Sequence, residues 1–155
     1  MKLSTRGRYA LRAMIELTKL QGNKTNPISL REISLRQDIS LTYLEQLFNK
    51  LKKAQLVKSV RGVEGGYLLA QKAEQISAAD IIRAVEGPIF ISACVYQQVH
   101  IKSKAREKCT KVDNCIAKSL WEELTIAINQ ILEKKSLMDL CNSILEEKGI
   151  KVDER

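Results

Sequence analysis

Apolar residues recur every three or four positions over residues 4–20, as they do along one face of an α-helix. Either Ser4 or Thr5 can cap this helix, because both side chains carry an oxygen that accepts from free backbone N–H groups. A stretch containing glycine, asparagine and proline at 22–27 then interrupts the pattern. The sequence therefore predicts one amphipathic helix followed by a loop.

Two further helical segments follow closely. Ser29, with Glu32 three residues later, has the sequence of a capping box at the start of a short helix. After a break at 38–40, a helix is predicted over 41–53. Its buried face comprises Leu44, Leu47, Phe48 and Leu51. A helix, a short turn and a second helix form the helix-turn-helix pattern.

The next segment changes to strand character. Residues 56–60 and 67–70 are short apolar runs on either side of a glycine-rich turn at 61–66, which predicts a β-hairpin. The glycines alone are weak evidence, because any hairpin can use them for positive φ. The order of elements is the specific signal: a helix-turn-helix followed by a hairpin is a winged helix. The expected fold class is mainly α with a small two-stranded wing.

The second half of the chain contains helices and one long irregular segment. Ser77 can cap a helix over 78–86, which ends at Gly87-Pro88. Residues 89–114 have no clean period, and so long a loop in a compact domain is usually functional or mobile. Two helices follow; their apolar residues are Ile116, Leu120, Leu124, Ile128, Ile131 and Leu132 in the first and Leu137, Leu140 and Ile144 in the second.

The long apolar stripe that begins at 116 has two interpretations. It can pack on its own domain, or it can pair with a second copy of the chain. We expect a homodimer, because winged helices usually read two half-sites as dimers with closed symmetry.

Charge is concentrated in the first part of this 155-residue chain. Residues 1–61 contain 13 Lys and Arg and four Asp and Glu, a net charge of +9, which leaves −1 for the remainder. Such a local excess is typical of a protein that binds a polyanion, although a solvated basic surface or a membrane surface would show it too. Because apolar periodicity separates the basic residues and no lipidation motif is present, we favour double-stranded DNA.

The sequence offers no membrane or export signal. No run of 18 apolar residues occurs, and charged residues interrupt the N-terminal segment. We therefore expect a cytoplasmic protein that contacts no membrane. No nucleophile and base are arranged as in an active site, so we do not expect an enzyme.

Three of the four cysteines share the irregular segment. Cys94, Cys109 and Cys115 lie there, whereas Cys141 lies on an apolar helix face and is interpreted as a small buried hydrophobe. In a cytosolic protein such clustering favours metal or redox chemistry over structural disulfides. Structural zinc normally uses closer pairs. Lysines beside Cys109 would favour a thiolate, so a thiol switch is the main alternative to an iron–sulfur cluster.

Three segments carry a resemblance to a known family. They are LSTRGRYALRAM at 3–14, ISLTYLEQLFNKLKKAQLVKSVRG at 39–62 and GGYLLA at 65–70. They resemble the Rrf2 family of winged-helix transcription regulators, most closely its members that sense iron–sulfur clusters. The resemblance implies a dimer held by crossed long helices. In cluster-binding members it also implies three cysteine ligands in the loop before the long helix.

The cysteine loop matches that family pattern in part. Five residues separate Cys109 from Cys115, as in the family, but fourteen separate Cys94 from Cys109, so this loop is longer. The family's fourth ligand, a histidine three residues after the last cysteine, corresponds to Lys118, whose ammonium group has no lone pair to donate. His100 is the only histidine; the other candidates are Asp113, Glu107 or a residue of the partner's first helix. The resemblance favours a [2Fe–2S] cluster, with [4Fe–4S] as the alternative.

The same resemblance places base contacts at the start of the helix over 41–53, which should enter the major groove. Four residues point away from its buried face: Ser40, Thr42, Glu45 and Gln46. Glu45 can accept from a cytosine amino group and Gln46 can pair with adenine.

The wing and the first helix supply the remaining DNA-binding candidates. Arg61 is expected in the minor groove or on a phosphate, while Gly65 and Gly66 let the backbone approach the duplex. Glu64 is unlike the neutral or basic wing tips of the family and argues against a strong phosphate contact there. The phosphate contacts expected from the first helix are Tyr9, Arg6 and Arg8.

The sequence thus predicts a dimeric DNA-binding transcription regulator that senses iron–sulfur cluster or redox status. The alternatives are a cluster-free or thiol-based regulator and an iron–sulfur redox or assembly protein. The expected division is a winged-helix domain over 1–86, a cluster loop over 87–115, dimerisation helices over 116–147 and a C-terminal tail over 148–155.

Overall fold

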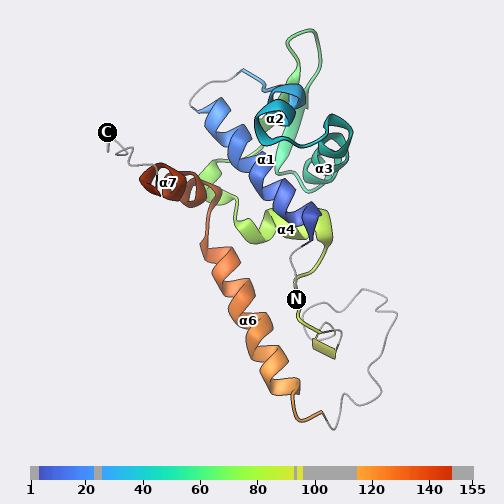
Figure 1. The fold of residues 1–155 in the computed structure, drawn as a ribbon, viewed down its shortest axis with the longest axis vertical. Coiled ribbons are helices and arrows are strands. Elements are labelled where there is room, and N and C mark those ends of the chain that lie inside the picture. The colour runs from blue at the N-terminus through green and yellow to red at the C-terminus, as the bar shows by residue number, and fades with distance from the viewer. Residues whose placement is uncertain (1–3, 23–25, 93, 96–114, 148–155) are drawn as a thin grey trace.

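The computed structural model describes residues 4–22, 26–92, 94–95 and 115–147 (Figure 1). Its elements are α1 (Thr5–Gln21), α2 (Leu30–Gln37), α3 (Leu41–Lys53), β1 (Val57–Val60), β2 (Gly66–Leu69), the 3-10 turn η1 (Ala73–Gln75), α4 (Ala78–Glu86), α6 (Lys118–Lys134) and α7 (Leu137–Glu147). The order helix, helix, helix, hairpin, helix confirms the predicted winged-helix fold. We call α1 to α4 with the two strands the head.

Serine side chains begin each helix of the head. Ser4, Ser40 and Ser77 accept hydrogen bonds from the first-turn N–H groups of α1, α3 and α4. At α4 the capping box is complete, because Asp80 returns a bond to the N–H of Ser77. At α2 only half of the expected box forms.

At α2 the side chain of Ser29 accepts from the N–H of Glu32. The carboxylate of Glu32 turns along the helix instead and pairs with Arg36 at 3.1 Å. The predicted reciprocal bond is therefore replaced by an ion pair between residues four positions apart.

The core lies around α1, which packs against α2, α3, α4 and α7 (Figure 1). The predicted apolar face of α3 is buried, since Leu44, Leu47, Phe48 and Leu51 are at most 1% exposed. Burying a side chain of this size stabilises the fold by about 1.5–3 kcal/mol. This core fixes the orientation of α3, so that the opposite face of the helix is exposed to solvent.

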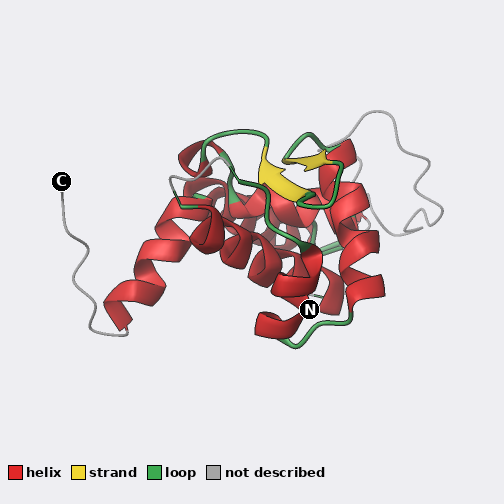
Figure 2. Ribbon diagram, turned by 90° about the horizontal axis from the view of Figure 1, so that it is seen from above, coloured by secondary structure: helices red, strands yellow, loops and turns green. Residues whose placement is uncertain are grey.

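The wing is a two-stranded antiparallel ribbon beside the helices (Figure 2). Val57 pairs with Leu69 at one end and Val60 with Gly66 at the other. A third segment joins the ribbon, because Ile28 and Tyr67 exchange backbone hydrogen bonds of 2.8 and 2.9 Å. The ring of Tyr67 then packs edge-on against Phe48 of α3, with ring centres 4.9 Å apart. The wing is thus held by the same core that holds α3.

The two C-terminal helices behave differently from each other. α6 runs away from the head, whereas α7 returns to pack on α1 (Figure 1). The return is fixed by backbone bonds from Ala78 N to Lys135 O and from Leu137 N to Ile76 O. Leu137 is completely buried in the core of the head. None of the described helices is both long enough and apolar enough to cross a membrane.

Candidate functional site

The outer face of α3 carries the predicted base-reading residues. Thr42, Glu45 and Gln46 are all exposed on the first turns of the helix, opposite its buried face. Ser40 is exposed too, and its hydroxyl oxygen accepts from the N–H of Tyr43 at 3.3 Å. The structure therefore brings the four residues together at one helix end, with Ser40 already used as the N-cap.

The N-terminal half of α1 braces this end of α3. The rings of Tyr9 and Tyr43 meet edge to face, with centres 5.9 Å apart. The guanidinium of Arg12 lies 5.5 Å from the centre of the Tyr9 ring and also donates to the backbone carbonyl of Gln37, the last residue of α2. Tyr9 thus lies at the junction of α1 and α3, and Arg12 connects α1 to the C-terminal end of α2.

Arg12 was not among the residues that sequence reasoning selected. Its position three residues after Tyr9 puts both side chains on one helix face, and this spacing is the signal that could have identified it. The other two α1 candidates, Arg6 and Arg8, are exposed near the helix start. Arg8 donates to the hydroxyl of Thr5 at 3.3 Å.

The wing tip is solvent-exposed from Arg61 to Glu64. The turn uses Gly62 at a φ of +123°, a conformation that L side chains rarely adopt. Gly65 and Gly66 serve a different purpose. A Cβ on Gly66 would lie 2.3 Å from the carbonyl oxygen of Ile28, and one on Gly65 would lie 2.6 Å from that of Val60. Both glycines are therefore required by close approaches inside the protein.

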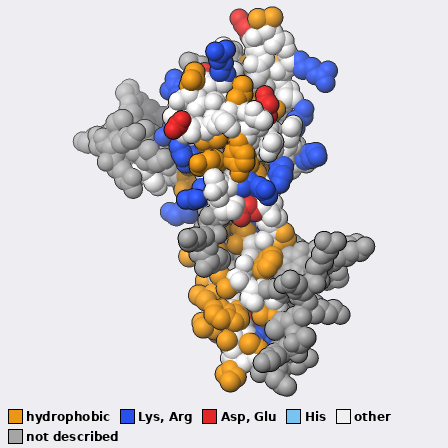
Figure 3. Space-filling model, turned by 45° about the vertical axis from the view of Figure 1, so that its right-hand side comes forward, with side chains coloured by type: hydrophobic (Ala, Val, Ile, Leu, Met, Phe, Trp, Pro, Cys, Tyr) orange, Lys and Arg blue, Asp and Glu red, His pale blue; other side chains and the backbone are white. Residues whose placement is uncertain are grey.

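Basic and apolar side chains are separated along the molecule. On the face seen in Figure 3, Lys and Arg side chains are scattered over the head, and apolar side chains gather below it, along α6. The exposed apolar residues of α6 are Leu120, Leu124, Ile126 and Ile131, between 39% and 62% exposed, and Ile116 just before the helix is fully exposed. In the described part of the chain, the predicted stripe thus has no covering element over much of its length.

Two of the three predicted cluster cysteines fall within the described residues. Cys94 is buried, and its sulfur lies 3.2 Å from the hydroxyl of Ser92. Cys115 is half-buried, and its carbonyl accepts from the N–H of Lys118 at 3.2 Å, at the turn that begins α6. Both thiols are free. Cys109 and the proposed fourth ligands His100, Glu107 and Asp113 lie outside the described residues.

Among the residues that the structure describes, no three His, Cys, Asp or Glu side chains gather as a metal site. Lys118, at the position of the family's fourth ligand, lies 4.0 Å from the carboxylate of Glu122. That carboxylate oxygen is buried and makes no hydrogen bond.

Cys141 is separate from the cysteine loop, as predicted. It is 5% exposed on α7, with its sulfur 3.9 Å from the carbonyl oxygen of Ile15. Burial raises the pKa of this thiol, and Glu16 acts in the same direction against the opposing charge of Lys19. The side chain contributes to packing and is poorly suited to form a thiolate.

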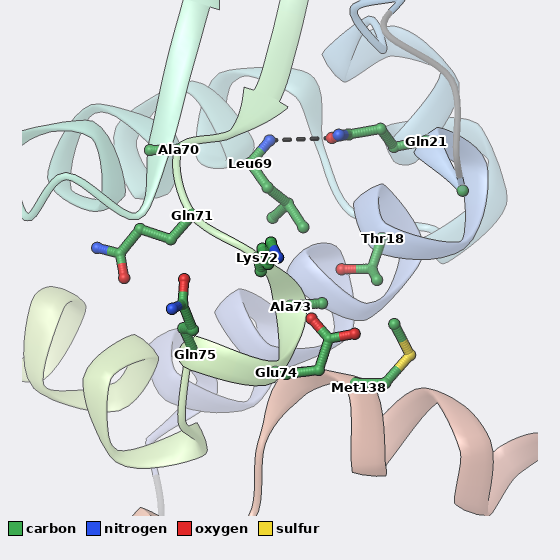
Figure 4. A pocket seen from close by; sticks show the side chains of 11 residues that line it. Thr18, Gln21, Leu69, Ala70, Gln71, Lys72, Ala73, Glu74, Gln75 and Met138 are labelled. Atoms are coloured by element: carbon green, nitrogen blue, oxygen red, sulfur yellow. Dashed lines mark hydrogen bonds between the residues drawn. The ribbon is translucent and has the colours of Figure 1, made fainter.

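A cavity of about 700 Å³ lies between the end of α1, β2, η1 and the start of α7 (Figure 4). Gln21 closes one side by accepting from the N–H of Leu69 at 2.9 Å. The hydroxyl of Thr18 donates to the carbonyl of Met14. No cysteine or histidine is among the described residues that line the cavity, so it is distinct from the predicted cluster site.

Comparisons with known proteins agree with this geometry. The family model for Rrf2, described as an iron-dependent transcriptional regulator, matches residues 3–143. The HTH-type transcriptional regulator IscR of Photorhabdus laumondii subsp. laumondii is 40% identical over 143 residues, which cover 92% of this chain and 80% of that protein.

Two solved structures are similar over nearly the whole chain. IscR of T. potens is 36% identical with a TM-score of 0.73, and the match covers 96% of this chain and 91% of that one. The oxidized form of CymR from Staphylococcus aureus is 38% identical with a TM-score of 0.65, covering 91% and 96%. The relatives are transcription regulators, which confirms that the chain is not an enzyme. The chain belongs to the Rrf2 family of winged-helix transcription regulators.

Proposed function

We propose that this regulator binds operator DNA as a homodimer and that an iron–sulfur cluster in its cysteine loop controls the binding. The observation that carries the proposal is the exposed face of Thr42, Glu45 and Gln46 on a helix that the core of the head holds rigidly. A helix of this kind can lie in the major groove, where each base pair presents a distinct pattern of donors and acceptors.

The remaining contacts are assigned to the DNA backbone. Arg61, Arg6 and Arg8 are exposed, and the N-terminal 61 residues carry a net charge of +9. Tyr9 is placed beside α3 by its contact with Tyr43 and can donate its hydroxyl to a phosphate. We propose that Gly65 and Gly66 contribute by keeping the wing backbone bare where it meets the duplex.

Dimerisation is assigned to α6. Leu120, Leu124 and Ile131 lie on one side of the helix, since at 100° per residue they fall within about 40° of each other. Thr125, which is buried, and Asn129 lie on the other side and face the chain's own loop and head. An uncovered apolar stripe on a separate helix fits a second copy, which would place two α3 helices for two half-sites.

The cysteines supply donors suitable for an iron–sulfur cluster. Cys94 and Cys115 are free thiols, and with Cys109 they give three thiolate ligands of the type that such clusters require. A bound cluster would supply one-electron redox chemistry and sensitivity to iron supply. The candidates for the fourth ligand are His100, a loop carboxylate and a partner-subunit residue.

The proposed division of labour follows the sequence. In this proposal the segment 1–86 binds DNA, the segment 87–115 senses iron–sulfur cluster or redox status, and the segment 116–147 holds the dimer together. Within this scheme α7 has a second task, because Leu137 and Cys141 pack into the head of their own chain.

The test combines spectroscopy with DNA binding. Protein purified without oxygen should contain iron, sulfide and visible absorption. Replacing any one of Cys94, Cys109 or Cys115 by alanine should abolish that absorption, while Cys141→Ala, the matched control, should keep it. Retention of bound iron after all three loop cysteines are replaced would refute the cluster. Failure of the purified dimer to select a specific duplex from a random pool would refute the DNA-binding role.

A thiol-based regulator is the second candidate. It is favoured by the similarity to an oxidized form of CymR and by the partial exposure of the Cys115 thiol. In that case mild oxidation of iron-free protein should change its DNA affinity, and Cys115→Ser should remove the change. No response to oxidation in the iron-free protein excludes this alternative.

A further inference from the structure

A polar network joins the beginning of the cysteine loop to α6 and to the head. On α6, the hydroxyl oxygen of Thr125 accepts from the N–H of Ile91 at 3.2 Å. One turn later the amide nitrogen of Asn129 donates to the carbonyl of Ile89 at 3.0 Å and to that of Thr125 at 2.8 Å. Residues 89–91, which lead directly to Cys94, are thus fastened to α6.

The side-chain oxygen of Asn129 contacts the head. The guanidinium of Arg83, on α4, donates to the side-chain oxygen of Asn129 and to the carboxylate of Glu133. Two residues further along α4, the carbonyl of Val85 accepts from the ammonium group of Lys50 on α3 at 3.0 Å. Asn129 therefore lies between the cysteine loop and the helix pair that carries the base-reading face.

The chemistry of an amide makes these two contacts interdependent. Its oxygen only accepts and its nitrogen only donates, so one orientation of Asn129 satisfies both Arg83 and Ile89. If the amide turned over, its N–H groups would face the N–H groups of Arg83, and its oxygen would face the carbonyl of Ile89. Thr125 is only 1% exposed, so water cannot easily replace the amide at its backbone carbonyl, the second acceptor of the Asn129 nitrogen.

We propose that Asn129 is a positioning residue that couples the cysteine loop to the reading head. A change in the loop that displaces residues 89–91 releases the Asn129 amide, which loosens Arg83 and changes the angle between α4 and α6. In a dimer built on α6, that angle sets the separation of the two α3 helices. The inference rests on the proposed function for its consequence at DNA, while the coupling itself involves only residues of one chain.

The first test measures the coupling without DNA or cluster. Amide hydrogen exchange is followed at residues 89–91 in the wild-type chain and in Arg83→Ala. Arg83 donates hydrogen bonds to Asn129 and Glu133 on α6, and the N–H of Ile91 donates to Thr125 on the same helix. Loss of Arg83 should therefore speed the exchange of residues 89–91 by about three- to tenfold, as expected when one net hydrogen bond is weakened. Gln130→Ala, an exposed neighbour of Asn129, is the control and should leave the exchange unchanged. Unchanged exchange in Arg83→Ala overturns the proposal.

The second test measures regulation with Asn129→Asp. A carboxylate still accepts from Arg83 but cannot donate to Ile89, so the head contact remains and the loop contact is lost. Wild-type DNA affinity should differ between cluster-loaded and cluster-free protein by the 5- to 150-fold typical of coupled sites, and the variant should reduce that ratio to below about twofold. A ratio that persists in the variant refutes the coupling. If the wild type itself shows no difference, the proposed cluster control fails, and the exchange experiment still decides the coupling.

Discussion

Glu45 and Gln46 are adjacent and exposed on α3, and they offer different hydrogen-bonding groups to DNA, because the Gln46 amide both donates and accepts. A carboxylate only accepts hydrogen bonds, so Glu45 can read a cytosine amino group but gains nothing from a phosphate. Glu45→Ala should therefore relax the base preference at one position in each half-site by about 1–3 kcal/mol. Fluorescence anisotropy with single-base operator variants measures this change.

Two comparisons make the Glu45 result specific. Arg61→Ala should weaken binding to most sequences alike and lower the salt slope by about 1, because a phosphate contact carries no base information. Glu123→Ala, on the exposed surface of α6, should change neither quantity. An unaltered base preference in Glu45→Ala would show that this residue is a solvated acid and no more.

The choice of glycine at position 66 is dictated by a segment far away in the sequence. Substitution of Gly66 by alanine would force a Cβ to within 2.3 Å of the carbonyl oxygen of Ile28 and separate the third segment from the wing. We expect a loss of about 1–3 kcal/mol in the free energy of unfolding, measured by urea denaturation. Val63→Ala at the fully exposed wing tip should change it by less than about 0.5 kcal/mol. Equal effects of the two substitutions would contradict the packing argument.

Cys141 should react slowly with alkylating reagents. Burial raises the pKa of its thiol, so at neutral pH its thiolate fraction is smaller than that of an unshielded cysteine, and it grows only as the pH rises further. Mass spectrometry after timed alkylation should find Cys115, which is half-buried, modified before Cys141. Comparable rates at pH 7 would mean that α7 does not stay packed on the head.

The apolar stripe of α6 yields a prediction for the whole element. Ile131→Glu places a charge in the proposed dimer contact, where it would lose its hydration without a partner, and should convert the dimer to monomer. Sedimentation equilibrium at micromolar concentration measures the change. Ile126→Glu is the matched control: this residue is 54% exposed but lies about 140° around the helix from the stripe. A dimer that survives Ile131→Glu must be formed elsewhere.

Local patterns predicted the elements of the head well. The face of α3 formed by Leu44, Leu47 and Phe48 was evident from spacing, because a helix buries residues three and four apart. Ser29 and Ser77 marked helix starts for the same local reason. The pairing of Ile28 with Tyr67 was not predictable, because 38 residues separate them and a two-residue bridge leaves no periodic signal.

The candidate DNA-binding site, like the fold, was predictable where it depends on local spacing and not where it depends on contacts between elements. The exposed residues of α3 follow from knowing which side is buried, whereas Arg12 was missed because its role depends on contacts with Tyr9 and Gln37 on two elements. Gly65 and Gly66 were selected as sites of approach to DNA. The structure adds internal close contacts that require glycine at both positions, and spacing alone could not reveal them.

At the scale of the whole molecule, charge distribution predicts the salt dependence of DNA binding. Residues 1–61 carry a net charge of +9, so an operator complex with six to ten neutralised phosphates should lose about three to five decades of affinity between 50 and 200 mM salt. Titration of one specific duplex across that range measures the slope. A slope near zero, or a complex containing one protein chain, would contradict the dimeric DNA-binding assignment.

The bridge between Ser77 and Ser136 has a consequence for how such regulators diversify. The chain leaves the head after the end of α4, and backbone hydrogen bonds return it beside the start of the same helix, so the segment 88–135 begins and ends at α4. Lengthening a loop within such a segment costs only about 0.6 kcal/mol per doubling. The fourteen residues between Cys94 and Cys109 therefore add little to the free-energy cost of folding by their length. We expect further insertions at this point in the chain to be tolerated by the fold, so it is a suitable place for grafting a new sensory segment.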